Sequence, residues 1–246
     1  MTLPIILNRV DPIYKAAENP PSDPAHQAVF IFLHGLGDSA IGIEGVADHF
    51  QSAHKLPHLH WILPNAMRNH EVGTTAWFTP KTTRLERGEG EDENGLLTSI
   101  AYLESLIDAC RNRGIPESRI VLGGFSQGSA ISLLTDLVSR KYSGRLAGIV
   151  GLMGQLPLAD GRRIEELRAN AGLPPTTGEA PVFLGRGKRD QVIDHARWIR
   201  TLEKLTSFQG TAIEVKEYAD IGHSLDSRVL NDVCSYLERI VPSLED

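Results

Sequence analysis

Residues 124–128 read GFSQG, which places one serine between two glycines. The apolar run 120–122 predicts a buried strand before this motif, and residues 130–138 repeat apolar side chains at helical spacing after it. A Gly-x-Ser-x-Gly motif between a strand and a helix is typical of a nucleophile elbow, where two glycines make room for a sharp turn. The pattern predicts Ser126 as a nucleophile. By itself it arises by chance in about one chain in ten of this length, so its context matters.

An acid and a histidine follow Ser126 in the order that such a nucleophile needs. The apolar run 182–184 predicts a strand, and Asp190 lies just beyond it. The strand predicted next, over 213–217, leads into His223. In the order Ser, Asp, His, the histidine is the general base for the serine, and the acid fixes the imidazole tautomer and stabilises the imidazolium. The sequence therefore predicts a catalytic triad.

Two other acids compete with Asp190 for this role. Asp194 lies four residues further on, inside the helix that its neighbours predict. Asp220 is three residues from His223, too near in the same turn to orient the imidazole easily. Asp190 is the acid that we favour.

A glycine-rich turn, HGLGD at residues 34–38, follows the continuous apolar run 28–33. A turn at the carboxyl end of a central strand is where open α/β sheets place their ligand chemistry. The backbone N–H groups of Leu36 in this turn and of Gln127 after the nucleophile are the predicted oxyanion donors. His34 is interpreted as structural support for the turn.

Strands and helices alternate along the whole chain, which predicts one α/β domain over residues 1–246 with a mostly parallel sheet covered by helices on both faces. An edge strand is expected at 5–10. Residues 64–93 show little periodicity and predict a long irregular loop near the active site. Trp77 and Phe78 in this loop are candidate substrate contacts.

Composition excludes several classes of function. The net charge of −6 and the pI near 5.9 argue against nucleic-acid binding, and no apolar run is long enough to span a membrane. Cys110 and Cys234 fall on apolar helix faces, so we expect buried thiols and a cytoplasmic protein without a signal peptide. No metal or other cofactor is expected, because the histidines do not follow a ligand pattern; they lie at 49, 54, 58, 60 and 70.

The chain resembles the acyl-protein thioesterases, in the phospholipase/carboxylesterase branch of the α/β-hydrolases. The segments that match are FLHGLGD (32–38), WF (77–78), EDENG (91–95), GIPESRIVLGGFSQGSA (114–130), LAGIVGLMGQLP (146–157), GRGKRDQVI (185–193) and GHS (222–224). The resemblance implies an α/β-hydrolase fold, and hydrolysis of S-palmitoyl groups on protein cysteines and of carboxyl esters, including lysophospholipids. It implies the same triad and oxyanion donors, and it leaves a weak homodimer open.

Four features depart from the family pattern. Ser129 replaces a second glycine in the elbow, and its hydroxyl is expected to bond to the backbone. Arg186 stands where the family has histidine, and the loop before Trp77 is shorter. Gln155 replaces a tryptophan before a Leu-Pro pair, which removes apolar surface worth about 1.5–3 kcal/mol if fully buried. Gln155 is therefore a third candidate substrate contact, and the preferred acyl length is left open.

Three functions remain as alternatives. The first is a serine hydrolase that cleaves acyl thioesters on proteins. The second is a carboxylesterase or lysophospholipase for shorter-chain esters that uses the same residues. The third is a catalytically idle member that binds an acyl group or a partner, which an intact triad argues against.

Overall fold

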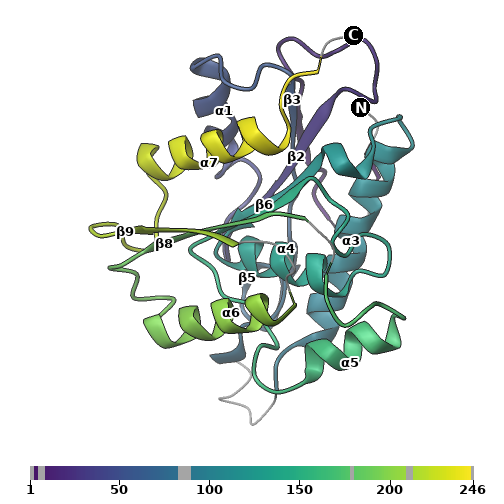
Figure 1. Ribbon diagram of the computed structural model, residues 1–246. Coiled ribbons are helices and arrows are strands. Elements are labelled where there is room, and N and C mark those ends of the chain that lie inside the picture. The colour runs from purple at the N-terminus through teal and green to yellow at the C-terminus, as the bar shows by residue number, and fades with distance from the viewer. Residues whose placement is uncertain (1–2, 5–8, 83–89, 178–179, 209–212, 245–246) are drawn as a thin grey trace.

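The computed structural model describes residues 3–4, 9–82, 90–177, 180–208 and 213–244. A seven-stranded sheet forms its centre, in the order β1-β3-β2-β6-β7-β8-β9 (Figure 1). All neighbouring strands are parallel except β1, which is antiparallel to β3. The strands span Ile13–Lys15 (β1), Ala28–Leu33 (β2), Leu59–Leu63 (β3), Ile120–Phe125 (β6), Gly148–Leu152 (β7), Val182–Gly187 (β8) and Ile213–Tyr218 (β9). The prediction of a mostly parallel sheet is confirmed.

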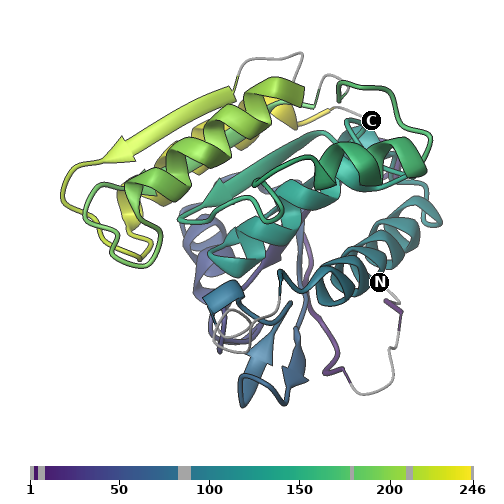
Figure 2. The same cartoon turned by 90° about the horizontal axis from the view of Figure 1, so that it is seen from below.

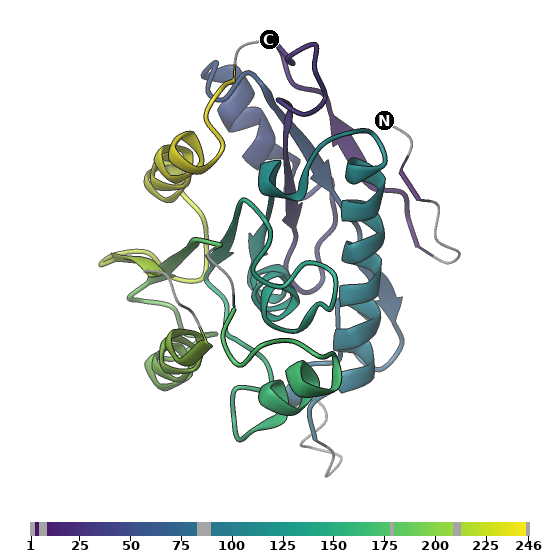
Figure 3. The ribbon, with the colours of Figure 1, turned by 45° about the vertical axis from the view of Figure 1, so that its right-hand side comes forward.

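Helices cover both faces of the sheet, as the alternation of elements predicts. Helices α1 and α7 pack on one face, whereas α3, α4, α5 and α6 pack on the other (Figures 2 and 3). The helices span Glu44–Ser52 (α1), Glu93–Arg111 (α3), Gln127–Val138 (α4), Arg163–Asn170 (α5), His195–Phe208 (α6) and Ser227–Ile240 (α7). Every residue of α4 is buried, so the helix that follows the GFSQG motif lies at the centre of the molecule.

The apolar runs of the sequence form the middle of the sheet. All six residues of β2 are buried, and successive side chains point to opposite faces. Val29, Ile31 and Leu33 join the core under α3–α6, while Phe30 and Phe32 join the core under α1 and α7. A strand buried on both faces needs apolar residues at every position, which is why these strands could be read from the sequence.

The first edge strand differs from the expectation. Of the run 5–10, residues 5–8 lie outside the described residues, and Val10 is exposed and in no strand. The observed edge strand is β1, whose Tyr14 pairs with Ile62 and shares a hydrogen bond of 2.7 Å with the His60 ring.

Residues 64–93 are not irregular throughout, which corrects the sequence prediction. They contain a hairpin of two three-residue strands, β4 (Met67–Asn69) and β5 (Thr74–Ala76) (Figure 2). The Asn69 side chain accepts the N–H groups of Glu71 and Val72, and Gly73 takes the positive φ of 78° that closes the turn. Helix α3 then begins at Glu93.

The sequence also led to predictions about the two cysteines and about membrane-spanning segments. Cys110 and Cys234 are both free and buried, as predicted. Within the described ranges, the structure has no helix long and apolar enough to cross a membrane.

Candidate active site

Ser126 lies at the junction of β6 and α4 in a backbone conformation that few L-residues adopt, with φ of 55° and ψ of −116°. The flanking glycines permit this turn. A Cβ atom at Gly124 would lie 2.6 Å from the carbonyl carbon of Gly128, and one at Gly128 would collide with the Leu33 backbone. The local strain is therefore held by the packing of α4 against β2, and it presents the serine hydroxyl at the end of the strand.

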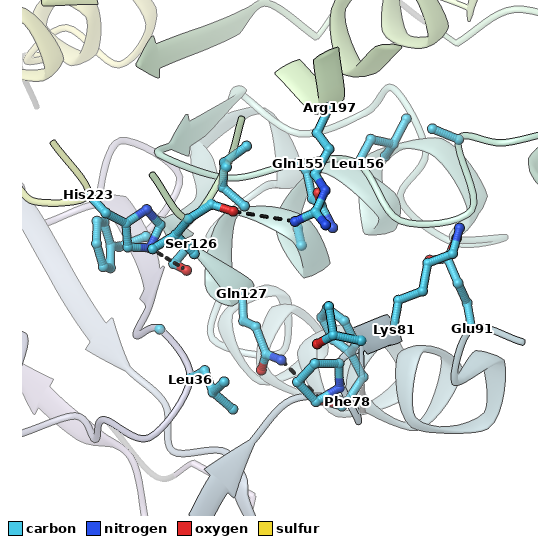
Figure 4. A pocket seen from close by; sticks show the side chains of 18 of the residues that line it. Leu36, Phe78, Lys81, Glu91, Ser126, Gln127, Gln155, Leu156, Arg197 and His223 are labelled. Atoms are coloured by element: carbon cyan, nitrogen blue, oxygen red, sulfur yellow. Dashed lines mark hydrogen bonds and ion pairs between the residues drawn. The ribbon is translucent and has the colours of Figure 1, made fainter. Parts of the chain in front are cut away.

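The three residues predicted as a triad lie in one hydrogen-bonded series (Figure 4 shows the Ser126–His223 half). Nε2 of His223 is 2.9 Å from Ser126 Oγ, and Nδ1 is 2.7 Å from Asp190 Oδ2. The Asp190 side chain is 1% exposed. A carboxylate accepts the proton on Nδ1, which leaves Nε2 as the acceptor for the serine hydroxyl.

Asp190 is fixed by its own turn. Its second oxygen, Oδ1, accepts the N–H groups of Val192 at 2.8 Å and Ile193 at 2.9 Å. These two hydrogen bonds from backbone donors hold the orientation of the carboxylate. The Phe125 ring packs 4.9 Å from the His223 ring, centroid to centroid, and limits imidazole motion from the other side.

The two competing acids lie elsewhere. Asp194 directly precedes α6, rather than lying inside it, and its side chain accepts the Arg197 N–H. Asp220 is paired with Arg228 at 2.8 Å on the surface. Hydrogen bonding to the Arg197 backbone lowers the pKa of Asp194, and the bond from Arg228 lowers that of Asp220. Neither faces His223 as Asp190 does.

The turn that carries Leu36 is braced by His34. The His34 ring donates from Nδ1 to the Gly35 carbonyl at 2.7 Å and accepts at Nε2 from the Ala66 N–H at 3.0 Å. Burial lowers the pKa of His34, which keeps the ring neutral, as this donor–acceptor pair requires. The Trp77 indole donates to the His34 carbonyl at 2.8 Å. These bonds fix the backbone on both sides of Gly35 and so position Leu36.

The side chain of Gln127 has a role that the sequence did not reveal. Its Oε1 accepts the Trp77 N–H at 3.1 Å, and its Nε2 donates to the Phe78 carbonyl at 3.1 Å. The residue after the nucleophile thus holds the segment 77–78 against the elbow. A long polar side chain directly after the predicted nucleophile is the signal that was available in the sequence.

A cavity of about 720 Å³ opens beside Ser126. Phe78 and Gln155, two of the candidate substrate contacts, line it. Trp77 does not: it is 2% exposed and lies in the core under α3 and α4, so its predicted role as a substrate contact is replaced by a role in bracing the turn. The remaining lining includes apolar residues, namely Leu36, Val72, Pro80, Phe125, Ala130, Leu156, Ala159, Val192 and Ile193.

Residues 16–241 match the phospholipase/carboxylesterase family. The chain belongs to this family. The resemblance stated from the motifs is therefore confirmed, and so is the prediction of a serine hydrolase with an α/β-hydrolase fold.

Relatives of this chain match it over most of its length. The protein named acyl-protein thioesterase 1 from Cryptococcus neoformans is 35% identical over 231 residues, covering 87% of this chain and 92% of that protein. The Yarrowia lipolytica protein of that name is 33% identical over 225 residues, covering 89% and 94%. Arabidopsis thaliana SOBER1 has a TM-score of 0.72 at 25% identity and covers 87% of this chain and 99% of its own.

One departure from the family pattern behaves differently from its prediction. Ser129, on the first turn of α4, is 1% exposed, and its Oγ has no hydrogen-bond partner among the described residues. The expected bond to the backbone is therefore absent there. The hydroxyl instead packs against Gly154, at which a Cβ would collide with it.

Charged residues at one end of the cavity were missed by the sequence analysis. Lys81, Glu91, Asp160, Arg197 and Arg200 all line it. Figure 4 shows Lys81 and Glu91 at the opposite side of the cavity from Ser126 and His223, with Arg197 between them. These residues come from three separate segments, so no motif in the sequence joins them.

Proposed function

We propose that Ser126, His223 and Asp190 form the catalytic triad of an acyl thioesterase that removes S-acyl groups, palmitoyl among them, from protein cysteines. The observation that carries this proposal is the pair of hydrogen bonds, of 2.9 Å and 2.7 Å, that joins Ser126 to His223 and His223 to Asp190. The membership of the phospholipase/carboxylesterase family and the relatives named acyl-protein thioesterase support the substrate class.

The chemistry follows from these atoms. His223 Nε2 takes the proton as Ser126 Oγ attacks the acyl carbonyl carbon, and the protonated imidazole then gives this proton to the departing thiolate. An acyl-serine ester remains. His223 next deprotonates a water molecule, which attacks the ester carbonyl carbon. The imidazolium then returns the proton to Ser126 Oγ as the bond between Oγ and the acyl carbon breaks and the fatty acid leaves, while Asp190 stabilises each imidazolium. Apart from the substrate and water, the proposed steps use groups of the polypeptide.

The backbone N–H groups of Leu36 and Gln127 are proposed to bind the oxyanion of both tetrahedral intermediates. Leu36 follows the Gly35 segment that His34 braces, and Gln127 opens α4, where the helix dipole places positive charge. Loss of one such donor typically raises the barrier by about 2.7–4 kcal/mol.

A carboxylesterase of shorter-chain esters is the second candidate. Gln155 and several charged side chains line the cavity where the acyl chain would lie, and an alkyl chain gains nothing from contact with them. Rates on oxygen esters and thioesters of increasing chain length separate the two candidates. Activity that falls beyond short chains would favour this second candidate.

A fluorophosphonate probe tests the proposed nucleophile directly. We expect the wild-type chain to be labelled at neutral pH and Ser126→Ala to be unlabelled, with kcat reduced by a factor of about 10⁴ or more. Ser129→Ala is the matched control, since it lies three residues away in the same elbow and should still be labelled. Labelling of Ser126→Ala would overturn the assignment of the nucleophile.

We further propose that residues 1–246 act as one cytoplasmic domain without a cofactor. A single seven-stranded sheet carries all the proposed catalytic residues, and both cysteines are buried and free, which supports this view. A weak homodimer stays a prediction of the family resemblance.

A further inference from the structure

Arg197 brings a charged group into the cavity close to the proposed nucleophile. It lies in the first turn of α6 and lines the cavity, and its side chain is 38% exposed. Figure 4 shows its guanidinium beside Gln155, on the Ser126 side of Lys81 and Glu91. A cation at this position would meet the acyl chain of a bound substrate.

The protein itself uses little of the hydrogen-bonding capacity of Arg197. Nη1 donates to the Val192 carbonyl at 3.3 Å, and Nε lies 3.5 Å from Asp194 Oδ2, both at the long end of the usual range. Among the described residues, Nη2 has no acceptor. A guanidinium carries five donors in a planar fork, so most of them face the cavity and its solvent.

Of the other two cations at this end of the cavity, Lys81 is better neutralised than Arg197, and Arg200 shares its carboxylate with Lys81. Lys81 Nζ is 2.8 Å from Asp160 and 3.5 Å from Glu91, two carboxylates that also line the cavity, and Arg200 lies 3.5 Å from the same Asp160. The carboxylate nearest to Arg197 is Asp194, which is outside the cavity lining. At this end, three cations therefore face two carboxylates.

Asp38 is the third carboxylate in the lining, and it does not neutralise Arg197. Asp38 belongs to the turn after β2, and its Oδ1 accepts the Ser39 N–H at 2.8 Å. The same turn carries Leu36, which Figure 4 shows away from Arg197, toward the Ser126 side of the cavity. The long contact with Asp194, at 3.5 Å, is therefore the ion pair of Arg197 among the described residues.

Gln155 supplies a second free donor at the same place. Among the described residues, its side-chain amide has no hydrogen-bond partner, although the residue is half-buried and lines the cavity. A guanidinium with unused donors beside an amide without a partner matches a carboxylate, which accepts two parallel N–H bonds from arginine. An alkyl chain at this point would desolvate the Gln155 amide and the unused donors of Arg197 without pairing them, which is unfavourable.

We propose that Arg197 and Gln155 form a carboxylate-binding subsite, and that the enzyme accepts acyl groups with a terminal carboxylate, such as glutaryl and adipoyl. This inference rests on the proposed hydrolase function and narrows its substrate class. Phe78, Leu156 and Val192 line the same cavity and supply apolar contact for the methylene groups between the two ends. The reacting carbonyl lies at Ser126, and the free carboxylate lies at Arg197.

The test compares two 4-nitrophenyl esters of equal chain length, hexanoate and the monoester of adipate. Charge-assisted hydrogen bonds of this kind correspond to about a 10- to 100-fold effect on kcat/KM. We expect Arg197→Gln to lower kcat/KM for the adipate monoester by about that factor and to change the value for hexanoate less than about 2-fold. Gln155→Leu should act in the same direction with a smaller effect.

Arg200→Gln is the matched control, because Arg200 is on the same helix but shares Asp160 with Lys81. It should leave the ratio of the two kcat/KM values within about 2-fold of wild type. An equal effect of Arg197→Gln on both esters, or a wild type that prefers hexanoate, would overturn the subsite and leave the hydrolase intact. A wild type that hydrolyses neither ester would overturn the proposed function itself.

Discussion

The hydroxyl of Ser129 is expected to lower the stability of the fold, because it is buried in the nucleophile elbow. The family pattern has glycine at this position, and here the hydroxyl is buried against Gly154 without a hydrogen-bond partner among the described residues. A buried hydroxyl without a partner typically costs about 1–3 kcal/mol. The neighbouring Ser132 differs, since its hydroxyl donates to the Gly128 carbonyl at 2.8 Å. The two serines of one helix therefore have opposite consequences for stability.

Ser129→Ala is expected to raise the free energy of unfolding by about 1 kcal/mol. The change removes the unpaired hydroxyl and replaces serine by a better helix former. Urea denaturation followed by circular dichroism measures the difference. Ser132→Ala is the control and should be neutral or destabilising, because it removes a hydrogen bond. Destabilisation by Ser129→Ala alone would mean that the hydroxyl has a partner in solution.

At the scale of elements, the predictable parts are those whose residues repeat a pattern. β2 and β6 are apolar at nearly every position, and the order of Ser126, Asp190 and His223 along the chain follows the order of the strands that carry them. These features need no knowledge of distant contacts. The fold class and the residues that now lie in one hydrogen-bonded series could therefore be read from the sequence.

The β4–β5 hairpin could not be read in this way, because distant contacts stabilise it. Its strands are three residues long and half-buried, so they carry no clear alternation. Thr75 makes two bonds to the turn after β2: its carbonyl accepts the Gly37 N–H at 2.8 Å, and its hydroxyl donates to the Asp38 carbonyl at 2.7 Å. The hairpin thus braces the segment that carries Leu36.

The different positions of Trp77 and Phe78 could not be predicted from the sequence either. Both are aromatic and adjacent, so the sequence treats them alike. In the bend after β5, Trp77 is fully inside the core, while Phe78 packs against that core only in part and also lines the cavity. Which of the two faces the substrate depends on how Gln127 anchors both backbones, and that contact spans about fifty residues.

Thr75→Val tests whether the hairpin positions the oxyanion turn. The variant keeps the shape of the side chain and removes the bond to the Asp38 carbonyl, which is worth about 1 kcal/mol. If the turn loosens, kcat should fall about 5-fold with KM nearly unchanged. Steady-state kinetics on a short-chain ester measure both values.

The control for this variant is Thr74→Val in the same strand. The Thr74 hydroxyl has no hydrogen-bond partner among the described residues, so we expect kcat to stay within about 2-fold of wild type. Equal losses in the two variants would indicate a general loss of the hairpin rather than a specific brace of the turn.

At the scale of the whole molecule, the parallel sheet places the site residues together, at the carboxyl ends of its strands. Ser126, Asp190 and His223 follow the carboxyl ends of β6, β8 and β9, and Leu36 follows that of β2. Loops at this edge bring together residues almost two hundred positions apart, as expected for open α/β sheets. Three other histidines, His34, His58 and His60, are buried and serve as neutral hydrogen-bonding groups. Their neutrality makes the stability of the fold depend on pH.

His60 provides the largest of these effects. Its Nδ1 accepts hydrogen bonds from the Tyr14 hydroxyl at 2.7 Å and the Ala17 N–H at 3.0 Å. Burial, with smaller contributions from Arg113 and His58, lowers the pKa of His60 from 6.5 to about 4. Between these pH values the His60 imidazole is protonated in the unfolded chain but stays neutral in the folded chain. The free energy of unfolding should therefore fall as the pH falls from about 6.5 to about 4, by about 3 kcal/mol from this residue.

Urea denaturation at a series of pH values measures this loss, and His60→Gln isolates it. The variant should be less stable than wild type near pH 7, because the packing against Tyr14 changes, but its stability should depend less on pH across the same window. His54→Gln is the matched control for the loss of an imidazole, since the His54 side chain is 84% exposed. Identical pH profiles for wild type and His60→Gln would show that the buried ring is protonated as readily in the folded chain as in the unfolded one.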